Sequence, residues 1–198
     1  MPVKSIQVIG FDPSMNNWGV SKGVITVDTV DFKQSFLKVN HLQVIQPVKP
    51  EGKQVRNNSK DLLAAEQLAR HAMAAAQGTQ AIFVEVPHGS QSARAMASYG
   101  VCIGVLGALR AMGIPFFEVS AMEVKIASSG NKTASKLDQI EWAMQQHPEA
   151  PWPMFTNNGK QQVSQAKAEH MADATAAIYA GVRTPAFQQL LALLLGQP

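Results

Sequence analysis

Apolar and polar residues alternate through most of the first 45 residues of the chain. A period of two is typical of strands that bury one face and expose the other. The alternation predicts strands at residues 5–12, Trp18–Val27 and Ser35–Ile45. A short polar turn joins the first two strands, so the three are expected to form an antiparallel meander.

From Ser59 the apolar residues recur at intervals of three and four, which is typical of helices. This spacing predicts a helix that ends at Gln77, before Gly78 as a stop signal. Further helices are predicted at Ser92–Met112, 121–128, 135–146, Ser164–Ala180 and Pro185–Leu195.

Two short apolar runs between these helices, residues 81–86 and 114–119, predict strands; the first, "AIFVEV", is apolar enough to be buried on both faces. Residues 147–162 hold several prolines and an Asn-Asn-Gly sequence, and they are interpreted as a loop. Three hairpin-linked strands followed by alternating helices and strands predict an α/β fold, a mixed five-stranded sheet flanked by helices.

The length of 198 residues fits one domain, and we expect a single domain over 1–198 with a C-terminal helical extension at 184–198. The one cysteine, Cys102, excludes an intrachain disulfide framework, so we expect a reducing compartment, the cytoplasm. Neither terminal region holds an apolar segment of signal-peptide or membrane-span length, so we expect no membrane partner.

The positive charge of the chain is concentrated in residues 47–60. The net charge is +3, and this segment alone supplies that excess. Its cations, set against Glu51, are Lys49, Lys53, Arg56 and Lys60. Two interpretations stay open: an ordinary solvated loop, or a loop that binds a phosphate backbone.

Two acidic residues end predicted strands. Glu85 follows four apolar residues, and burying its carboxylate would be costly unless a cation or hydrogen bonds compensate it. Asp12 ends the first strand just before Pro13. The alternatives are a frayed strand end that leaves Glu85 in water and a turn in which Asp12 caps its own backbone.

A third group lies in the late predicted helix. His170 and Asp173 are three residues apart and share a helix face, and Glu169 could share it too. The face could simply be solvated. Together with the two strand-end acids, however, these groups make the oxygen- and nitrogen-rich set that hard divalent cations need. Two such ions about 4 Å apart would hold a phosphodiester and activate water for in-line attack.

Three segments resemble the RuvC family of Holliday junction resolvases, which has an RNase H-like fold: "VIGFDPSMNNWGV", "FVEVP" and "HMADATAAIYA". The resemblance runs from residue 5 to about 182. It implies the RNase H-like (RuvC-type) sheet, with Asp12 as the metal-bridging carboxylate. It further implies two Mg²⁺ or Mn²⁺ ions held by Asp12, Glu85, His170 and Asp173, with Glu169 as the competitor of His170.

Residues 123–140 resemble the family segment that carries two functional lysines, which fall on Lys125 and Lys136, with Lys132 as a competitor. Lys136 is expected to offset charge at the scissile phosphate. The chain lacks the aromatic residue that many members have after the second acid, and His88 is a substitute; Arg94 is a further expected DNA contact. Longer segments at 47–60 and 147–162 are compatible with a phage-encoded relative.

The resemblance implies a structure-selective endodeoxyribonuclease that cleaves four-way DNA junctions symmetrically in recombination and repair. It also implies a homodimer formed through helix 92–112, whose side with Gly100, Gly104, Gly107 and Ala108 is nearly bare and could face either the sheet or a second copy. The nearest alternative is another RNase H-like nuclease acting on forks or RNA–DNA hybrids. An actin-like phosphotransferase would need more nucleotide-binding motifs, and the four grouped metal-ligand types disfavour a non-catalytic DNA-binding module.

Overall fold

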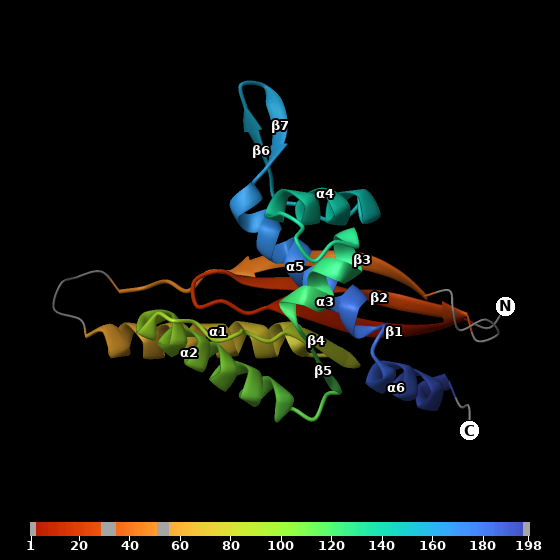
Figure 1. Ribbon diagram of the computed structural model, residues 1–198, viewed down its shortest axis with the longest axis horizontal. Helices are drawn as coiled ribbons and strands as arrows, with labels where there is room; N and C mark the ends of the chain where they lie inside the picture. The colour runs from red at the N-terminus through yellow and green to blue at the C-terminus, as the bar shows by residue number, and fades with distance from the viewer. Residues whose placement is uncertain (1–2, 29–34, 51–55, 196–198) are drawn as a thin grey trace.

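A mixed five-stranded sheet forms the centre of the protein, as predicted. The computed structural model describes residues 3–28, 35–50 and 56–195 (Figure 1). The sheet has the strand order β3-β2-β1-β4-β5. Antiparallel pairs join β1 to β2 and β2 to β3, whereas β4 pairs in parallel with both β1 and β5. The strands are β1 (Val3–Asp12), β2 (Trp18–Asp28), β3 (Ser35–Ile45), β4 (Ala81–Glu85) and β5 (Phe116–Val119).

Helices cover both faces of this sheet. They are α1 (Asn57–Ala76), α2 (Ala93–Arg110), α3 (Ala121–Ser129), α4 (Lys136–Gln146), α5 (Gln165–Gly181) and α6 (Pro185–Leu195). Helices α1 and α2 lie on one side of the sheet, and α3, α4 and α5 lie on the other (Figure 1). Every predicted helix is present, and so is every predicted strand of the sheet. Each end lies within two residues of its predicted position. Among the helices that the structure describes, none is long and apolar enough to cross a membrane.

The alternation in β1 assigns its side chains to two cores. Ile9 and Phe11 pack with apolar residues of α1 and α2, while Ile6 and Val8 pack with Ile178 of α5 and with apolar residues of α6. Because successive side chains point to opposite faces, Asp12 falls on the α5 face with Val8. The pattern that builds the core therefore also directs Asp12 towards α5.

Glycines in the sheet let α5 approach its backbone closely. A Cβ atom added at Gly10 would lie 2.0 Å from the carbonyl oxygen of Ala174, and one added at Gly19 would lie 2.0 Å from that of His170. A hydrogen bond from Thr175 Oγ1 to Ser21 Oγ, 2.9 Å long and buried, crosses the same contact. The separation of α5 from the sheet is thus set by the absence of side chains at two positions.

The structure corrects one prediction. The sequence predicts a loop at residues 147–162, but two short antiparallel strands form at its end, β6 (Met154–Asn157) and β7 (Lys160–Val163). Asn158 and Gly159 have φ angles of 49° and 75°, the positive values that a tight two-residue hairpin turn requires. Asn-Gly is the strongest short hairpin signal, but the four-residue strands beside it lack the alternation of apolar and polar residues that predicts a strand.

Candidate functional site

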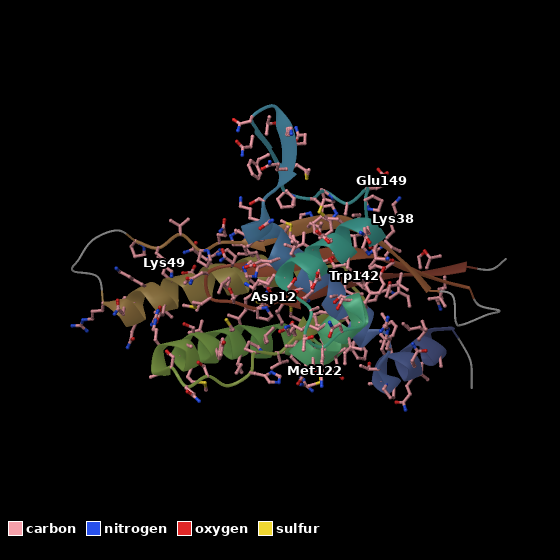
Figure 2. The ribbon with its side chains drawn as sticks, turned by 45° about the horizontal axis from the view of Figure 1, so that its top comes forward. Asp12, Lys38, Lys49, Met122, Trp142 and Glu149 are labelled. Atoms are coloured by element: carbon pink, nitrogen blue, oxygen red, sulfur yellow. The ribbon has the colours of Figure 1, made fainter. Side chains whose placement is uncertain are left out.

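Asp12 and Glu85 end two neighbouring parallel strands. Phe11 is in register with Val84, so the next residues of the two strands, Asp12 and Glu85, lie side by side. Both lie on the α5 face, because Phe83, two residues before Glu85, packs in the core on that face. Figure 2 shows Asp12 near the middle of the molecule, below α4. The fold therefore brings the two strand-end carboxylates together, as the sequence suggested.

Helix α5 adds the imidazole of His170 and two further carboxylates, Glu169 and Asp173. His170 Nδ1 lies 2.7 Å from Asp12 Oδ2, and His170 Nε2 lies 3.4 Å from Glu169 Oε1. Because a carboxylate only accepts hydrogen bonds, His170 donates from Nδ1. Asp173, one turn further along α5, is close enough to Asp12 and Glu85 for their charges to act on it. Asp12, Glu85, His170 and Asp173 thus lie around the carboxyl ends of β1 and β4, with Glu169 beside them.

The carboxylates of this cluster repel one another. Burial, followed by the charge of Asp12, raises the pKa of Glu85 to about 7. Burial also raises the pKa of Asp173 well above its ordinary range, and the charges of Asp12, Glu85 and Glu169 raise it further. Each shift reports negative charge held out of water without an equal positive partner. Such a cluster favours binding of protons or cations.

Two of the predicted lysines flank the cluster. Lys136 Nζ, at the start of α4, forms an ion pair of 2.9 Å with Glu169 Oε2, and this hydrogen bond raises the pKa of Lys136. Lys125 of α3 lowers the pKa of Glu85 through its positive charge, so that charge lies within electrostatic range of the site. Lys132 is exposed in the connection between α3 and α4.

Sequence reasoning missed Gln139. This residue of α4 is only 4% exposed, and its Nε2 donates a hydrogen bond of 2.7 Å to Asp173 Oδ1. The bond fixes one oxygen of a carboxylate that is otherwise costly to bury. A signal was available: Gln139 lies on the buried side of α4 with Ile140 and Ala143, where an apolar residue is expected.

The remaining predicted DNA contacts lie around the site at different distances. Lys49 Nζ donates to Asn16 Oδ1 in the turn after β1, and Figure 2 shows Lys49 towards the end of the molecule where α1 begins. Arg56 and Lys60 lie at the start of α1, and Lys53 lies outside the described residues. His88 is exposed just beyond β4, and its charge lowers the pKa of Glu85.

Arg94 of α2 forms a bidentate ion pair with Asp61 of α1, with distances of 2.6 and 2.7 Å. The Arg94 guanidinium therefore joins α2 to α1. Its contact with DNA stays a prediction.

A divalent metal fits the chemistry of the cluster. Over residues 3–28, 35–50 and 56–195, no three or more His, Cys, Asp or Glu side chains are arranged so that they could hold a metal ion. The imidazole of His170 bonds instead to Asp12, and Asp173 bonds to Gln139. The donors are nevertheless three carboxylates and one imidazole, and the raised pKa values of two carboxyls show the charge that a hard cation would neutralise.

The bare side of α2 faces away from the sheet. A Cβ atom added at Gly100, Gly104 or Gly107 would meet nothing within 4 Å, and Met96 and Ile103 are exposed on the same helix. Of the two alternatives left open by the sequence, packing of these glycines on the sheet is therefore wrong. Cys102 points inward, and burial raises the pKa of its thiol to about 11.

A mixed five-stranded sheet with helices on both faces, in which Asp12 and Glu85 end adjacent parallel strands beside α5, makes this an α/β fold. The chain matches RuvC from Thermus thermophilus with 19% identity and a TM-score of 0.60, covering 93% of this chain and 96% of the other. It matches T. thermophilus RuvC in complex with a Holliday junction substrate with 18% identity and a TM-score of 0.59, covering 88% and 92%. The protein therefore has the RuvC fold, which the sequence resemblance implied. No protein-family model and no curated protein sequence matches the chain.

Proposed function

We propose that this protein is a member of the RuvC family and a metal-dependent endonuclease that cleaves four-way DNA junctions. One observation carries the proposal. Within a RuvC fold, Asp12 and Glu85 end adjacent parallel strands and face His170 and Asp173 on α5. Such an arrangement of carboxylates and imidazole suits hydrolysis of a phosphodiester, whose own negative charge must be offset.

The metal ligands in this proposal are Asp12, Glu85, His170 and Asp173, and the ions are Mg²⁺ or Mn²⁺, two in each site. When bound, the ions polarise the scissile phosphate and lower the pKa of the attacking water. Gln139 orients Asp173 by holding Oδ1. His170 must turn its Nδ1 proton away from Asp12, or offer Nε2, before it can act as a ligand, because only an unprotonated ring nitrogen coordinates a metal.

Lys136 is the proposed charge-neutralising residue. Its side chain is long and exposed, and its ammonium is held beside the cluster by Glu169. An incoming phosphate offers the ammonium another anionic partner next to the site. Lys136 would then offset the charge that develops on the phosphate during attack, and Lys125 would support it from α3.

DNA binding and dimerisation complete the proposal. Lys49, Arg56, Lys60, Lys132 and His88 would contact phosphates, as would Lys53. Two symmetric cuts in a four-way junction need two active sites related by a two-fold axis, and the exposed glycine face of α2 offers a surface for a second copy.

A panel of labelled DNA substrates tests the proposed function. The protein is incubated with Mg²⁺ or Mn²⁺ and a four-way junction, a fork, an RNA–DNA hybrid or a linear duplex, with Asp12→Asn as the inactive control. We expect paired symmetric nicks in the junction from the unmodified protein alone. Faster cleavage of forks or hybrids would replace the junction as substrate, and absence of metal-dependent cleavage on every substrate would overturn the proposal.

A further inference from the structure

The β6–β7 ribbon, residues 154–163, protrudes from the body of the protein without covering a core. It extends beyond α4 and away from the sheet (Figure 1). Seven of its eight strand residues are exposed, including the apolar side chains of Met154 at 48% and Phe155 at 45%. An isolated two-stranded hairpin of this kind is only marginally stable by itself, so folding of the domain does not explain it.

The base of the ribbon is held firmly in the domain. Trp152, just before β6, is buried, and its Nε1 donates a 2.9 Å hydrogen bond to the carbonyl oxygen of His147. The backbone N–H of Ser164 donates to the carbonyl oxygen of Pro153 at 2.8 Å, which closes the two ends together. Val163 packs against the core that Trp152 shares with α5. The ribbon is therefore an anchored arm.

This anchor lies next to the proposed active site. Helix α5 begins at Gln165, one residue beyond the end of β7, and His170 follows five residues later. At 1.5 Å per residue, about 7.5 Å of helix separates them along its axis. A strand of nucleic acid bound in the active site would thus pass close to the base of the ribbon.

One face of the ribbon has the chemistry of a nucleic-acid contact. Opposed residues in an antiparallel pair share a face, so the pairings of Phe155 with Gln162 and of Asn157 with Lys160 place these four side chains together. Phe155 and Gln162 also border a hollow of about 650 Å³ that reaches the first turn of α5. The hollow is open to solvent, so it leaves the Phe155 ring accessible on that side.

The charge of the segment matches a phosphate backbone. Residues 150–168 include Lys160 and Lys167 and no acidic residue, although Glu149 and Glu169 flank them directly. An exposed aromatic ring beside amides and a lysine, with no opposing charge, is the composition used to stack bases and neutralise phosphates. A segment that bound another protein would not need to lack acidic residues, as residues 150–168 do.

We propose that the β6–β7 ribbon is a DNA-binding arm. It binds the DNA strand that leaves the active site, with Phe155 stacking on a base and Lys160 contacting a phosphate. The inference rests on the proposed function, because it identifies a further contact with the same DNA. It assigns a role to a segment whose length and exposure the catalytic cluster does not need.

Binding measurements across a salt series test the arm. Phe155→Ala and Lys160→Ala are each made in the inactive Asp12→Asn protein, and affinity for a labelled four-way junction is measured. The matched controls are Leu193→Ala, which removes an apolar side chain that is 74% exposed on α6, and Lys38→Ala, which removes an exposed lysine of β3. A third variant replaces residues 155–162 with two glycines, a permitted link because Met154 and Val163 are directly paired.

Phe155→Ala is expected to weaken binding at least about fivefold at every salt concentration, the loss of one stacked base. Lys160→Ala is expected to lower the slope of log affinity against log salt by about 0.7 to 0.9, the loss of one phosphate contact. The ribbon replacement should produce both effects, and the controls should produce neither.

Unchanged affinity and salt slope in all three ribbon variants would overturn the proposal that the ribbon binds DNA. A change in oligomeric mass without a change in affinity would instead assign the ribbon to a contact between copies of the protein. The two hypotheses fail separately. If the unmodified protein cleaves junctions and the ribbon variants bind them normally, only the arm is wrong. If the unmodified protein neither binds nor cleaves branched DNA, the proposed function itself fails.

Discussion

His170 donates from Nδ1 to Asp12 Oδ2 across 2.7 Å, although 158 residues separate the two in the chain. The same imidazole lies 3.4 Å from Glu169 through Nε2. One ring thus connects the carboxylate that ends β1 with the one that holds Lys136. Because His170 lies beside Asp12 and Glu169 lies beside His170, variants of each residue are needed to identify the metal ligand.

We expect His170→Ala to lower the cleavage rate by more than about 100-fold, because it removes a proposed ligand and frees the Asp12 carboxylate from its donor. His170→Asp should keep part of the activity, since aspartate also binds Mg²⁺. Glu169→Gln, which keeps the size of the side chain, should retain most of it. Single-turnover cleavage of a junction measures all three, and a reversed order would make Glu169 the ligand.

Stability of the metal-free protein should fall as the pH rises. The pKa of Glu85 is about 7 in the folded protein, above its ordinary 4.5, so the folded state holds the proton more tightly than the unfolded state. The resulting stabilisation is complete below pH 4.5 and is lost as the pH rises through 7, by up to about 3 kcal/mol. Glu85→Gln should flatten this dependence. Denaturant unfolding in a chelator from pH 5 to pH 8 gives the comparison, and parallel curves for the two proteins would contradict it.

Magnesium should stabilise the protein more at pH 8 than at pH 6. At the higher pH Glu85 is ionised and can bind the cation, whereas at the lower pH most of it carries a proton. At 100 times the dissociation constant the stabilisation is about 2.7 kcal/mol. Thermal unfolding with and without Mg²⁺ measures it, with Asp12→Asn as the control that should gain much less. An equal gain in both proteins would place the metal elsewhere.

Removing the amide of Gln139 should weaken catalysis without unfolding the protein. Gln139→Leu preserves the approximate volume but leaves Asp173 Oδ1 without its donor. Loss of such an orienting partner typically costs 10- to 100-fold in metal affinity or activity, so a decrease of about that size is expected. Gln145→Leu, an exposed position of the same helix, is the matched control. If both variants cleave at the same rate, Gln139 has no part in orienting the site.

Gly19→Ala should damage both stability and activity. The new Cβ would lie 2.0 Å from the backbone oxygen of His170, which no side-chain rotation relieves. Helix α5 must shift, at a cost of about 1–3 kcal/mol or more, and His170 moves with it. Gly100→Ala, on the open side of α2, should instead gain about 0.5–1 kcal/mol from improved helix propensity. Thermal unfolding of the two variants measures the difference. Equal melting temperatures would show that the close contact of Gly19 with the His170 backbone does not limit stability.

Local pattern determined the elements of this fold and part of its site. Alternation and helical spacing depend only on nearby residues, so they located the helices and the strands of the five-stranded sheet to within two residues. Glu85 was identifiable as a candidate because a carboxylate in an apolar strand is costly to bury unless it is compensated, whereas Asp12 was assigned through the resemblance to the RuvC family. The β6–β7 ribbon was missed because its two four-residue strands are almost fully exposed and carry no period of two.

Tertiary structure alone decided which side chains meet. The bond of His170 to Asp12, that of Gln139 to Asp173 and the pairing of Lys136 with Glu169 join segments that the sequence keeps far apart. Their geometry depends on the close approach of α5 to the sheet, which Gly10 and Gly19 permit. Periodicity shows which face of an element is buried, but partners and distances follow from how all the elements pack at once, and no local pattern contains that information.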